Sequence, residues 1–458
     1  MSPQDYRGLP VVVAGAGVSG AAAARALADR GARVTVVDAS QERAEPLRAK
    51  GLTVVATDVA PPGTALVVTS PGWRPDAPLL VASAAAGIEV IGEVELAWRL
   101  RGQGAAPWLA ITGTNGKTTT VRMLACVLSA AGLRTVATGN VGLPLLDAVL
   151  AADPYDVLAV ELSSFQLHWS STVRPHTAVV LNVAPDHVDW HGSLDAYAEA
   201  KGRIHAPGTT AVYNREDAES VRLADRAFRR GAARAGFTLG SPAAGELGVV
   251  QDLVVDRAFP DVPGEATALG TLADLPVPGA HNVANALAAA ALARSYGVPA
   301  GAVAEGLRAF APDPHRNALV ATVAGVAWVD DSKATNPHAA AASLAAYPSV
   351  VWLAGGLLKG AEVDELVRTA APRLRGVVLL GTDRAPFLAA LRRHAPDVPV
   401  VEVGRLDTVA MRDVVSAARG LARPGDTVLL APAAASMDCF RDYAQRGELF
   451  ATAVRGLS

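Results

Sequence analysis

The stretch Ile-Thr-Gly-Thr-Asn-Gly-Lys-Thr-Thr-Thr at residues 111–120 decides the fold of this 458-residue chain. It follows the apolar run Trp108–Ile111, which predicts a short buried strand, and it precedes an apolar-rich run that predicts a helix. Glycines in such a turn let backbone N–H groups converge on a phosphate, because no side chain blocks the approach. Lys117 can reach the terminal phosphates, and the Thr118 hydroxyl can ligate Mg²⁺. The stretch therefore predicts a binding loop for a nucleoside triphosphate, although Ile111 occupies the position of the usual first glycine.

Composition excludes several classes of function. The chain has 51% hydrophobic and 19% charged residues, and its length predicts about three domains that each bury a core. A net charge of −3 gives no basic field, so we expect no nucleic-acid partner. The apolar run Val283–Ala293 is too short to span a bilayer, and we expect neither a signal peptide nor membrane association. Cys126 and Cys439 predict buried free thiols in a reducing compartment, which favours a cytoplasmic protein, and we expect a monomer.

Residues 1–103 alternate strand-length apolar runs with helix-length segments, which predicts a parallel sheet. The first run leads into the turn Gly15-Ala-Gly17-Val-Ser-Gly20, and the second ends at Asp38. This pattern matches a dinucleotide-binding fingerprint with an acidic residue about 20 positions further on. The same turn accommodates any diphosphate, so a UDP-sugar fits as well as NAD, and a purely structural turn is a third interpretation. The predicted strands are Val11–Ala14, Arg33–Val37, Thr53–Val55, Leu66–Thr69 and Glu89–Ile91.

Two further segments complete the predicted architecture. A linker-like stretch at 101–107 precedes a central segment, residues 104–312, which contains a small β insertion at 236–280 and a helix at 281–296. Prolines near residue 313 mark a second boundary, because they resist regular structure. The expected fold is α/β with three domains: a Rossmann-like domain at 1–103, a P-loop-type ATPase domain with a parallel sheet at 104–312, and a Rossmann-like doubly wound domain at 313–458. The strands expected in the last two segments are 135–137, 156–160, 177–182, 209–212, 326–330, 350–354, 376–380, 399–402 and 426–430.

Polar residues follow two predicted strands of the central segment. Glu161 stands at the tip of the run Asp156–Val160, where its carboxylate can ligate Mg²⁺ directly or through water; a solvated strand-end glutamate is the alternative. The stretch Asn182-Val-Ala-Pro-Asp-His187-Val-Asp-Trp-His191 follows the next strand. Two histidines and two aspartates suggest zinc, but no cysteine or further histidine lies near in the sequence. We therefore interpret His187 as a neighbour of Mg²⁺ or phosphate, and His191 as structural.

Lys201 stands in an otherwise apolar helical stretch, residues 196–204. Desolvation disfavours an ammonium group, and a neutral lysine amine can add CO₂ to become a carbamate, an anion suited to a metal site. Composition alone favours a simpler interpretation, in which Lys201 is a surface lysine whose apolar stem lies along the protein.

Three polar loops follow predicted strands in the last segment. In the first, Asn336 or Thr335 can cap the helix that Pro337 opens. Ordinary helix caps explain each loop singly, but Thr, Lys and Ser in three strand-end loops predict a pocket for a small dicarboxylate. The loops are Asp330-Asp-Ser-Lys-Ala-Thr-Asn-Pro337, Gly355-Gly-Leu-Leu-Lys-Gly360 and Ala431-Pro-Ala-Ala-Ala-Ser-Met-Asp438.

These motifs, in this order, resemble the Mur ligases, the ATP-dependent enzymes that add amino acids during peptidoglycan assembly. The resemblance covers essentially the whole chain, and the last two motifs are most similar to those of the D-glutamate-adding members. The matching elements are Gly113–Thr119, Gly139–Gly142, Glu161–Gln166, Asn182–His187, Lys201, Gly279–Asn285, His315–Arg316, Asp331–Asn336, Gly355–Gly360 and Ala433–Asp438.

The resemblance implies an ATP-dependent ligase that joins D-glutamate to UDP-N-acetylmuramoyl-L-alanine through an acyl phosphate, and it implies four sets of site residues. ATP would be bound by Gly113, Thr114, Asn115, Gly116, Lys117, Thr118, Thr119, Asn285, Arg316 and Asp331. Two Mg²⁺ ions would be held by Thr118, Glu161, His187 and Lys201 as a carbamate. The UDP-linked substrate would meet Val18, Ser19, Gly72, Asn140 and His187. D-Glutamate would meet Thr335, Lys359, Ser436 and Tyr443. The catalytic residues would be Lys117, Glu161, His187 and Lys201.

This chain departs from the family pattern at three places. Ala39-Ser40 follows Asp38 where relatives carry Thr-Arg, the glycine-rich loop lacks a polar pair seen in some relatives, and Ala434 replaces a frequent cysteine. Two alternatives stay open. One is a sister ligase of the same architecture, which adds L-alanine, a diamino acid or the glutamates of folate. The other is an NAD-dependent oxidoreductase built on the turn at Gly15, which would leave the phosphate-binding loop without a role.

Overall fold

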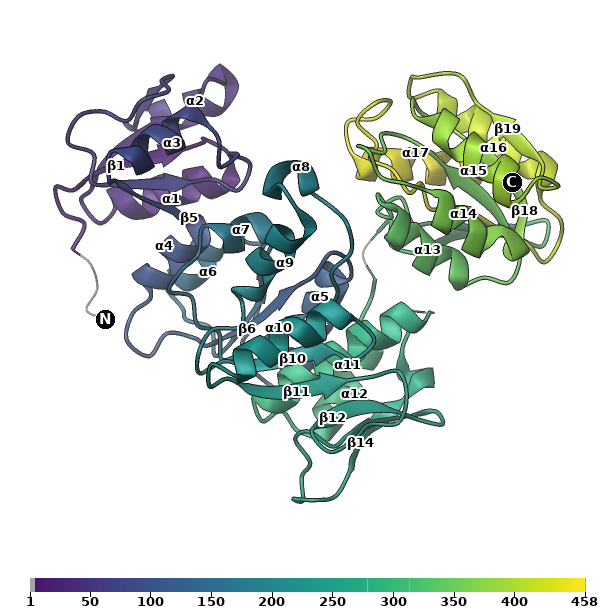
Figure 1. Cartoon of the computed structure of the whole chain (residues 1–458), viewed down its shortest axis with the longest axis horizontal. Coiled ribbons are helices and arrows are strands. Elements are labelled where there is room, and N and C mark those ends of the chain that lie inside the picture. The colour runs from purple at the N-terminus through teal and green to yellow at the C-terminus, as the bar shows by residue number, and fades with distance from the viewer. Residues whose placement is uncertain (1–4, 278, 313, 458) are drawn as a thin grey trace. The chain divides into compact units, whose positions relative to one another are not determined.

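The computed structural model describes residues 5–277, 279–312 and 314–457 (Figure 1). The chain divides into two compact units. The first comprises Met1–Val183, His187–Leu275 and Ala284–Phe310, and the second comprises Ala184–Asp186, Pro276–Val283 and Ala311–Ser458. The predicted three-domain division stays a prediction, and residue 313, at its second boundary, lies outside the described residues.

The N-terminal sheet of the first unit is five-stranded and parallel, in the order β3-β2-β1-β4-β5. Apolar residues fill both faces of β1, as buried parallel strands require. All five predicted strands are confirmed. They are β1 (Pro10–Ala14), β2 (Arg33–Val37), β3 (Thr53–Val55), β4 (Leu66–Thr69) and β5 (Glu89–Gly92), with helices α1 (Val18–Ala28), α2 (Gln41–Arg48), α3 (Pro78–Ala85) and α4 (Glu93–Leu100).

The central sheet has nine strands in the order β14-β13-β12-β11-β10-β9-β6-β8-β7. Its strands are β6 (Trp108–Thr112), β7 (Ala137–Gly139), β8 (Leu158–Glu161), β9 (Thr177–Val180), β10 (Thr210–Asn214), β11 (Ala233–Phe237), β12 (Glu246–Val250), β13 (Leu253–Asp256) and β14 (Thr267–Thr271). Two expectations need correction. The sheet is mixed rather than parallel, because β12, β13 and β14 pair antiparallel. The predicted insertion therefore extends the main sheet. The strand expected at 135–137 lies two residues later, at the sheet edge.

Helices complete the first unit. Gly306 lets α12 approach α5 closely, because a Cβ there would lie 2.4 Å from the Val127 Cα.

Cys126 is a free cysteine, as predicted, but it is half-buried rather than buried, since it lies beside the apolar stripe of α5. The helices are α5 (Lys117–Ala130), α6 (Leu145–Val149), α7 (Ser164–His168), α8 (Val188–His191), α9 (Leu194–Gly202), α10 (Ala218–Phe228), a 3₁₀ turn (Leu272–Asp274), α11 (Ala280–Ser295) and α12 (Ala300–Ala309). Within the described residues, no helix combines the length and apolar character that a membrane span requires.

The sheet of the second unit has six strands in the order β15-β16-β20-β17-β18-β19. All pairs are parallel except β15 with β16, an edge pair that the sequence pattern did not reveal. Cys439 is also free and half-buried. The strands are β15 (Ala318–Val323), β16 (Val326–Asp330), β17 (Val350–Ala354), β18 (Leu374–Leu379), β19 (Val400–Glu402) and β20 (Thr427–Leu430); the helices are α13 (Pro337–Ala345), α14 (Asp364–Ala370), a 3₁₀ turn (Ala371–Arg373), α15 (Arg384–His394), α16 (Ala410–Leu421) and α17 (Tyr443–Arg455).

Candidate active site

The loop between β6 and α5 contains a glycine that cannot be replaced without a clash. Gly116 has φ +83°, and a Cβ there would lie 2.3 Å from the Asn285 side-chain oxygen. The same oxygen accepts a hydrogen bond from the Thr120 hydroxyl at 3.2 Å. The structure thus brings Asn285, predicted to bind ATP, directly against the phosphate-binding loop.

Asn182 fixes the shape of this loop. Its backbone carbonyl accepts from the Thr114 N–H at 3.0 Å, and its side-chain oxygen accepts from the Asn115 N–H at 2.9 Å. Its side-chain amide donates back to the Asn115 carbonyl at 3.2 Å. Sequence reasoning quoted Asn182 within a motif but gave it no role of its own. Its position at the end of the neighbouring strand β9 was the available signal.

Two lysines converge on one carbonyl of the loop. Lys117 Nζ donates to the carbonyls of Gly113 and Thr114, both at 2.9 Å. Lys201 Nζ donates to the same Gly113 carbonyl at 2.8 Å, although it comes from the far end of α9. Lys201 is only 1% exposed, so its interpretation as a surface lysine is wrong. The side-chain nitrogens of Lys117 and Lys201 therefore lie together at the edge of the sheet that carries the phosphate-binding loop.

Glu161 presents a buried carboxylate with one oxygen unused. It ends β8 and pairs in register with Ile111, immediately before the phosphate-binding loop. Oε1 accepts a hydrogen bond from Asn140 Nδ2 at 2.8 Å, whereas Oε2 is buried and has no hydrogen-bond partner among the described residues. An unpaired buried carboxylate oxygen is costly unless a cation or water satisfies it. A hard carboxylate oxygen beside a phosphate-binding loop fits Mg²⁺.

His187 lies at the start of α8 with a left-handed φ of 51°. Its ring lies 4.8 Å from the Phe165 ring and 6.3 Å from the Tyr197 ring, centroid to centroid. Lys201 Nζ lies 4.3 Å from the same Tyr197 ring. His187 and Lys201, both predicted near the metal, therefore contact one tyrosine, whose hydroxyl is 3.1 Å from that of Thr114.

His191, for which the sequence predicts a structural role, contacts the first residue of α7. Its Nε2 lies 3.0 Å from the Ser164 hydroxyl. Burial, with the charges of His168 and Lys201, lowers the pKa of His191 to about 4, so the ring is neutral at physiological pH. No group of three or more His, Cys, Asp or Glu side chains suited to a metal occurs among the described residues, which leaves the zinc alternative without support.

The N-terminal turn uses Asp38 as an internal brace. One carboxylate oxygen accepts from the Ala16 N–H and the other from the Ser40 N–H, both at 2.8 Å. The Arg43 guanidinium donates to both oxygens, at 3.1 and 2.9 Å. Burial raises the pKa of Asp38, but these hydrogen bonds outweigh it and hold the pKa below its usual value. An NAD site needs this carboxylate for ribose hydroxyls, so the arrangement disfavours the oxidoreductase alternative.

The residues predicted to bind the UDP-linked substrate lie at the ends of strands in the first unit. Val18 and Ser19 open α1, Gly72 follows β4, and Asn140 follows β7. Val18 is 74% exposed, which is unusual for valine and leaves its surface available for contact. Of these residues, Asn140 is brought directly against a predicted metal ligand, Glu161.

Three loops of the second unit lie side by side because β16, β20 and β17 are neighbours. Leu357 and Ala435 exchange backbone hydrogen bonds at 2.8 and 2.9 Å, and the Ala433 N–H donates to the Ala334 carbonyl at 2.9 Å. The structure therefore brings together the three segments that carry Thr335, Lys359 and Ser436. Asn336 caps α13 by accepting from the Ala339 N–H, so the cap does not use Thr335.

Arg446 ties two of these loops to α17. It is fully buried and donates to the Ser332 hydroxyl at 2.9 Å, the Ser332 carbonyl at 2.8 Å and the Ala434 carbonyl at 3.2 Å. Burial lowers its pKa to about 10. The Ser332 hydroxyl in turn donates to the carbonyl of Tyr443, the first residue of α17. A single arginine in a helix gives no sequence signal, and sequence reasoning missed it.

Asp331, one of the two residues of the second unit that are predicted to bind ATP, is half-buried. Asp331 accepts from the Ser343 hydroxyl and from the Asn317 N–H, and burial raises its pKa to about 6 in spite of the charge of Arg316. His315 Nδ1 lies 2.6 Å from an Asp330 carboxylate oxygen, and this hydrogen bond raises the pKa of His315. The assignment of Arg316 and Asp331 to ATP stays a prediction.

Backbone strain concentrates in these loops. Seven described residues other than glycine have positive φ. Gln251 and Ala324 lie in the tight turns of the hairpins β12–β13 and β15–β16. Of the other five, three lie in strand-end loops that carry predicted site residues, and two flank Arg316 just before β15; such strain is commonly retained at functional sites. They are His187, His315, Asn317, Lys359 and Ala433.

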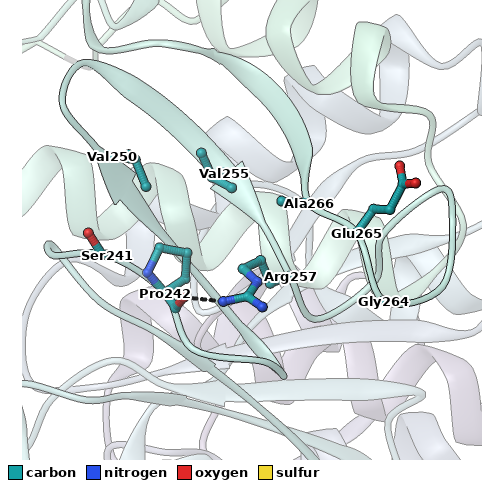
Figure 2. Close-up of a pocket in the computed structure, with 8 residues that line it drawn as sticks. All are labelled: Ser241, Pro242, Val250, Val255, Arg257, Gly264, Glu265 and Ala266. Atoms are coloured by element: carbon teal, nitrogen blue, oxygen red, sulfur yellow. Dashed lines mark hydrogen bonds between the residues drawn. The ribbon is translucent and has the colours of Figure 1, made fainter.

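A surface pocket of about 450 Å³ lies elsewhere, in the antiparallel part of the central sheet (Figure 2). Figure 2 shows the Arg257 side chain reaching toward Pro242, whose carbonyl accepts its hydrogen bond at 3.2 Å. Its lining includes none of the predicted site residues. The residues predicted to carry the chemistry lie instead in the strand-end loops. The lining residues are Ser241, Pro242, Val250, Val255, Arg257, Gly264, Glu265 and Ala266.

This chain matches three family models and is similar over nearly its whole length to known proteins. The Mur ligase middle domain matches residues 111–293, the Mur ligase glutamate ligase domain matches 315–434, and the TrkA-N domain matches 11–65. UDP-N-acetylmuramoylalanine–D-glutamate ligase of Thermobifida fusca is 61% identical, over 99% of this chain and 100% of that protein. The enzyme of the same name from Mycobacterium avium is 50% identical, over 98% and 96%.

Solved structures share the fold at low sequence identity. MurF from Acinetobacter baumannii superposes with a TM-score of 0.62 at 18% identity, covering 97% of this chain and 93% of that one. UDP-N-acetylmuramate–alanine ligase MurC from Thermotoga maritima superposes with a TM-score of 0.58 at 20% identity, covering 98% and 100%. Both similarities concern the fold alone, and they agree with the predicted α/β class.

Proposed function

This chain belongs to the Mur ligase family, and we propose that it is the ATP-dependent ligase that joins D-glutamate to UDP-N-acetylmuramoyl-L-alanine. The observation that carries the proposal is the convergence of Lys117 and Lys201 on the Gly113 carbonyl, beside the unpaired carboxylate oxygen of Glu161. The Lys117 cation and a metal-binding carboxylate at one phosphate-binding loop serve phosphoryl transfer, and Lys201 lies where a carbamate would add a second anionic ligand. A dinucleotide-dependent oxidoreductase would use none of them.

The reaction follows from the chemistry of carboxylates. A free carboxylate does not acylate an amine, because oxide is too poor a leaving group. An oxygen of the muramoyl-alanine carboxylate attacks the γ-phosphorus of ATP, the bond to the bridging oxygen breaks, and ADP leaves. The amine of D-glutamate then attacks the acyl carbon, loses a proton, and expels phosphate. Lys117 stabilises the charge on the transferring phosphoryl group. Asn182 fixes the shape of the loop by accepting hydrogen bonds from the Thr114 and Asn115 N–H groups.

Family membership implies Mg²⁺ together with ATP, and the residues present fit the ion. Thr118, Glu161, His187 and Lys201 as a carbamate would hold two Mg²⁺ ions. When bound, Mg²⁺ neutralises charge on the phosphates. Asn140 orients the Glu161 carboxylate through its hydrogen bond, which leaves the second oxygen directed elsewhere.

D-Glutamate brings two carboxylates, which need cations, hydroxyls and N–H donors. Adjacent loops offer these groups through Lys359, Thr335 and Ser436. Tyr443, the first residue of α17, would complete the site. The UDP-linked substrate would lie on Val18, Ser19, Gly72 and Asn140. We place the reaction in the cytoplasm, with a monomeric enzyme and without nucleic-acid or membrane partners.

The decisive experiment measures phosphate release from ATP and UDP-N-acetylmuramoyl-L-alanine with D-glutamate, L-glutamate, L-alanine or a diamino acid as acceptor. We expect turnover with D-glutamate and little with the others. Preferred use of another amino acid would assign the chain to a sister ligase. Phosphate release that requires no UDP-linked substrate would contradict the proposal.

A further inference from the structure

The turn Gly381-Thr382-Asp383 follows β18 and contacts both loops that we assign to D-glutamate. No motif in the sequence marks this turn. Asp383 holds the glycine-rich loop from two sides: its carboxylate accepts from the Leu358 N–H at 2.8 Å, and its own N–H donates to the Gly356 carbonyl at 3.1 Å. The first of these bonds fixes the residue immediately before Lys359.

The same turn also holds the loop that carries Ser436. The Thr382 N–H donates to an Asp438 carboxylate oxygen at 2.8 Å, and the other oxygen of Asp438 accepts from the Cys439 N–H at 3.0 Å. Asp438 stands two residues after Ser436. The three-residue turn is therefore a physical link between the two loops, in addition to the backbone pairing of Leu357 with Ala435.

Close packing leaves no freedom at the start of the turn. Gly381 has φ +80°, and a Cβ there would lie 2.6 Å from the Asp438 carboxylate and 2.6 Å from the Gly356 nitrogen. Both loops thus contact the same glycine. Any side chain at this position would push them apart.

Lys359 needs such support because it cannot position itself. Its side chain is exposed, its φ of 53° lies in the left-handed region, and Gly360 follows it. An exposed lysine has many rotamers, so its ammonium is placed only as well as its backbone is. The residue before it is held by the hydrogen bond that the Leu358 N–H donates to the Asp383 carboxylate.

We propose that Asp383 and Asp438 are positioning residues for the amino-acid site: through the 381–383 turn they fix the spacing between Lys359 and Ser436. This spacing selects an acceptor by the separation of its two carboxylates, and so favours glutamate over the shorter aspartate. The inference rests on the proposed function, which assigns Lys359 and Ser436 to D-glutamate.

The test compares wild-type enzyme with Asp383→Ala and Asp383→Asn in steady-state assays. For Asp383→Ala we expect the KM for D-glutamate to rise about tenfold, the scale of losing a hydrogen bond to a charged group, and the preference for D-glutamate over D-aspartate to fall. The KM values for ATP and for the UDP-linked substrate should stay within about twofold. Asp383→Asn keeps an acceptor oxygen for the Leu358 N–H and should recover most of the affinity. Asp364→Ala is the matched control: this half-buried aspartate at the start of α14 pairs with Arg393 and His394 and belongs to neither loop.

Each outcome decides the matter. An unchanged KM for D-glutamate, or an equal rise in all three KM values, would overturn the inference while leaving the proposed function intact. A wild-type enzyme that does not use D-glutamate would instead refute the proposed function. If Asp383→Ala fails to fold by circular dichroism, Asp438→Ala provides the same test from the Ser436 side, because it removes the acceptor of the Thr382 N–H, and we expect the same rise in the KM for D-glutamate.

Discussion

Asn140 Nδ2 donates a hydrogen bond to Glu161 Oε1 at 2.8 Å, and Glu161 Oε2 stays buried with no hydrogen-bond partner among the described residues. The Asn140 N–H also donates to the Glu161 backbone carbonyl at 2.9 Å. A carboxylate fixed in this way has one oxygen committed to orientation and the other available for a cation. The pair links a residue predicted for the UDP-linked substrate to one predicted for the metal.

Replacing Glu161 with Gln should reduce ligase activity by about 100-fold or more, because the variant loses the anionic oxygen available to Mg²⁺ while keeping the acceptor for Asn140. The residual activity should need a higher Mg²⁺ concentration for half-saturation. Initial rates across a Mg²⁺ series test this. Glu305→Gln, on the exposed face of α12, is the control and should match the wild type. An unaltered Mg²⁺ dependence in Glu161→Gln would remove Glu161 from the metal site.

Lys117→Ala should lower turnover by about 100-fold or more, the scale of removing one preorganised charge. The fold should persist, because Lys117 is half-buried at the start of α5 and its Nζ donates to two carbonyls of its own loop. Turnover and thermal melting measured together separate the two effects. Lys50→Ala, at an exposed helix end, should change neither. Near-normal turnover in Lys117→Ala would contradict the ATP assignment.

Local patterns in the sequence predict most of the strands and helices of the fold. Continuous apolar runs such as Val11–Ala14 predict buried parallel strands, and the structure places β1 there. The mixed pairing of β12, β13 and β14 could not be predicted, because strand direction depends on distant partners rather than on local composition. The edge strand β15 was missed for a related reason: its mostly half-exposed residues, Ala318–Val323, give neither a buried run nor a clear alternation.

Some residues of the candidate site can likewise be predicted from the sequence, and others cannot. Lys117 and Thr118 are predictable, because one contiguous loop carries the chemistry. Arg446, Asp383 and Asn182 act through backbone groups that are distant in sequence, and a single polar residue in a helix or turn does not reveal such contacts. The burial of Lys201 could be predicted only in part. Its apolar sequence setting indicates desolvation, but only the fold brings its Nζ to the Gly113 carbonyl.

Stability should depend on pH through Glu93, the first residue of α4. Glu93 is 3% exposed, and burial, with a contribution from Asp147, raises its pKa to about 7 in spite of the hydrogen bond from the Leu146 N–H. The folded state therefore binds this proton more tightly than the unfolded state, whose pKa is near the ordinary value. The free energy of unfolding falls as pH rises from about 4.5 to about 7, and the loss is complete near pH 8.

Glu93→Gln should remove this dependence. We expect the variant and the wild type to have similar melting temperatures at pH 5. At pH 8 the variant should melt at a higher temperature, and its free energy of unfolding should exceed that of the wild type by on the order of 3 kcal/mol. Melting curves of both proteins from pH 5 to pH 8.5 provide the measurement, and the difference between them cancels the titration of other groups. A difference that is constant with pH would show that Glu93 titrates normally.

The acceptor site should discriminate the hand of glutamate. Lys359, Thr335 and Ser436 would hold both carboxylates, which fixes the direction of the amine, so L-glutamate should be a poor substrate. Lys359→Ala should raise the KM for D-glutamate by at least about tenfold, because the variant loses the ion pair between Lys359 and a carboxylate of D-glutamate. The KM for ATP should stay nearly unchanged, because ATP does not take part in this ion pair. Parallel rises in both KM values would place Lys359 outside the acceptor site.

Lys201 should carry a carbamate in the active enzyme. The neutral amine attacks the carbon of CO₂, a C–N bond forms, and the released proton goes to solvent; the new anion then suits a metal site. Lys201 is 1% exposed and lies within an apolar helical stretch, a setting that favours the neutral amine. We therefore expect CO₂-depleted, mildly acidic buffer to lower activity and bicarbonate to restore it. Lys201→Ala should lose about 100-fold or more of its activity, with partial rescue by a short carboxylate such as formate, whereas Lys50→Ala should respond to neither. Full activity in CO₂-depleted buffer, together with an unmodified Lys201 by mass spectrometry of the intact protein, would exclude the carbamate.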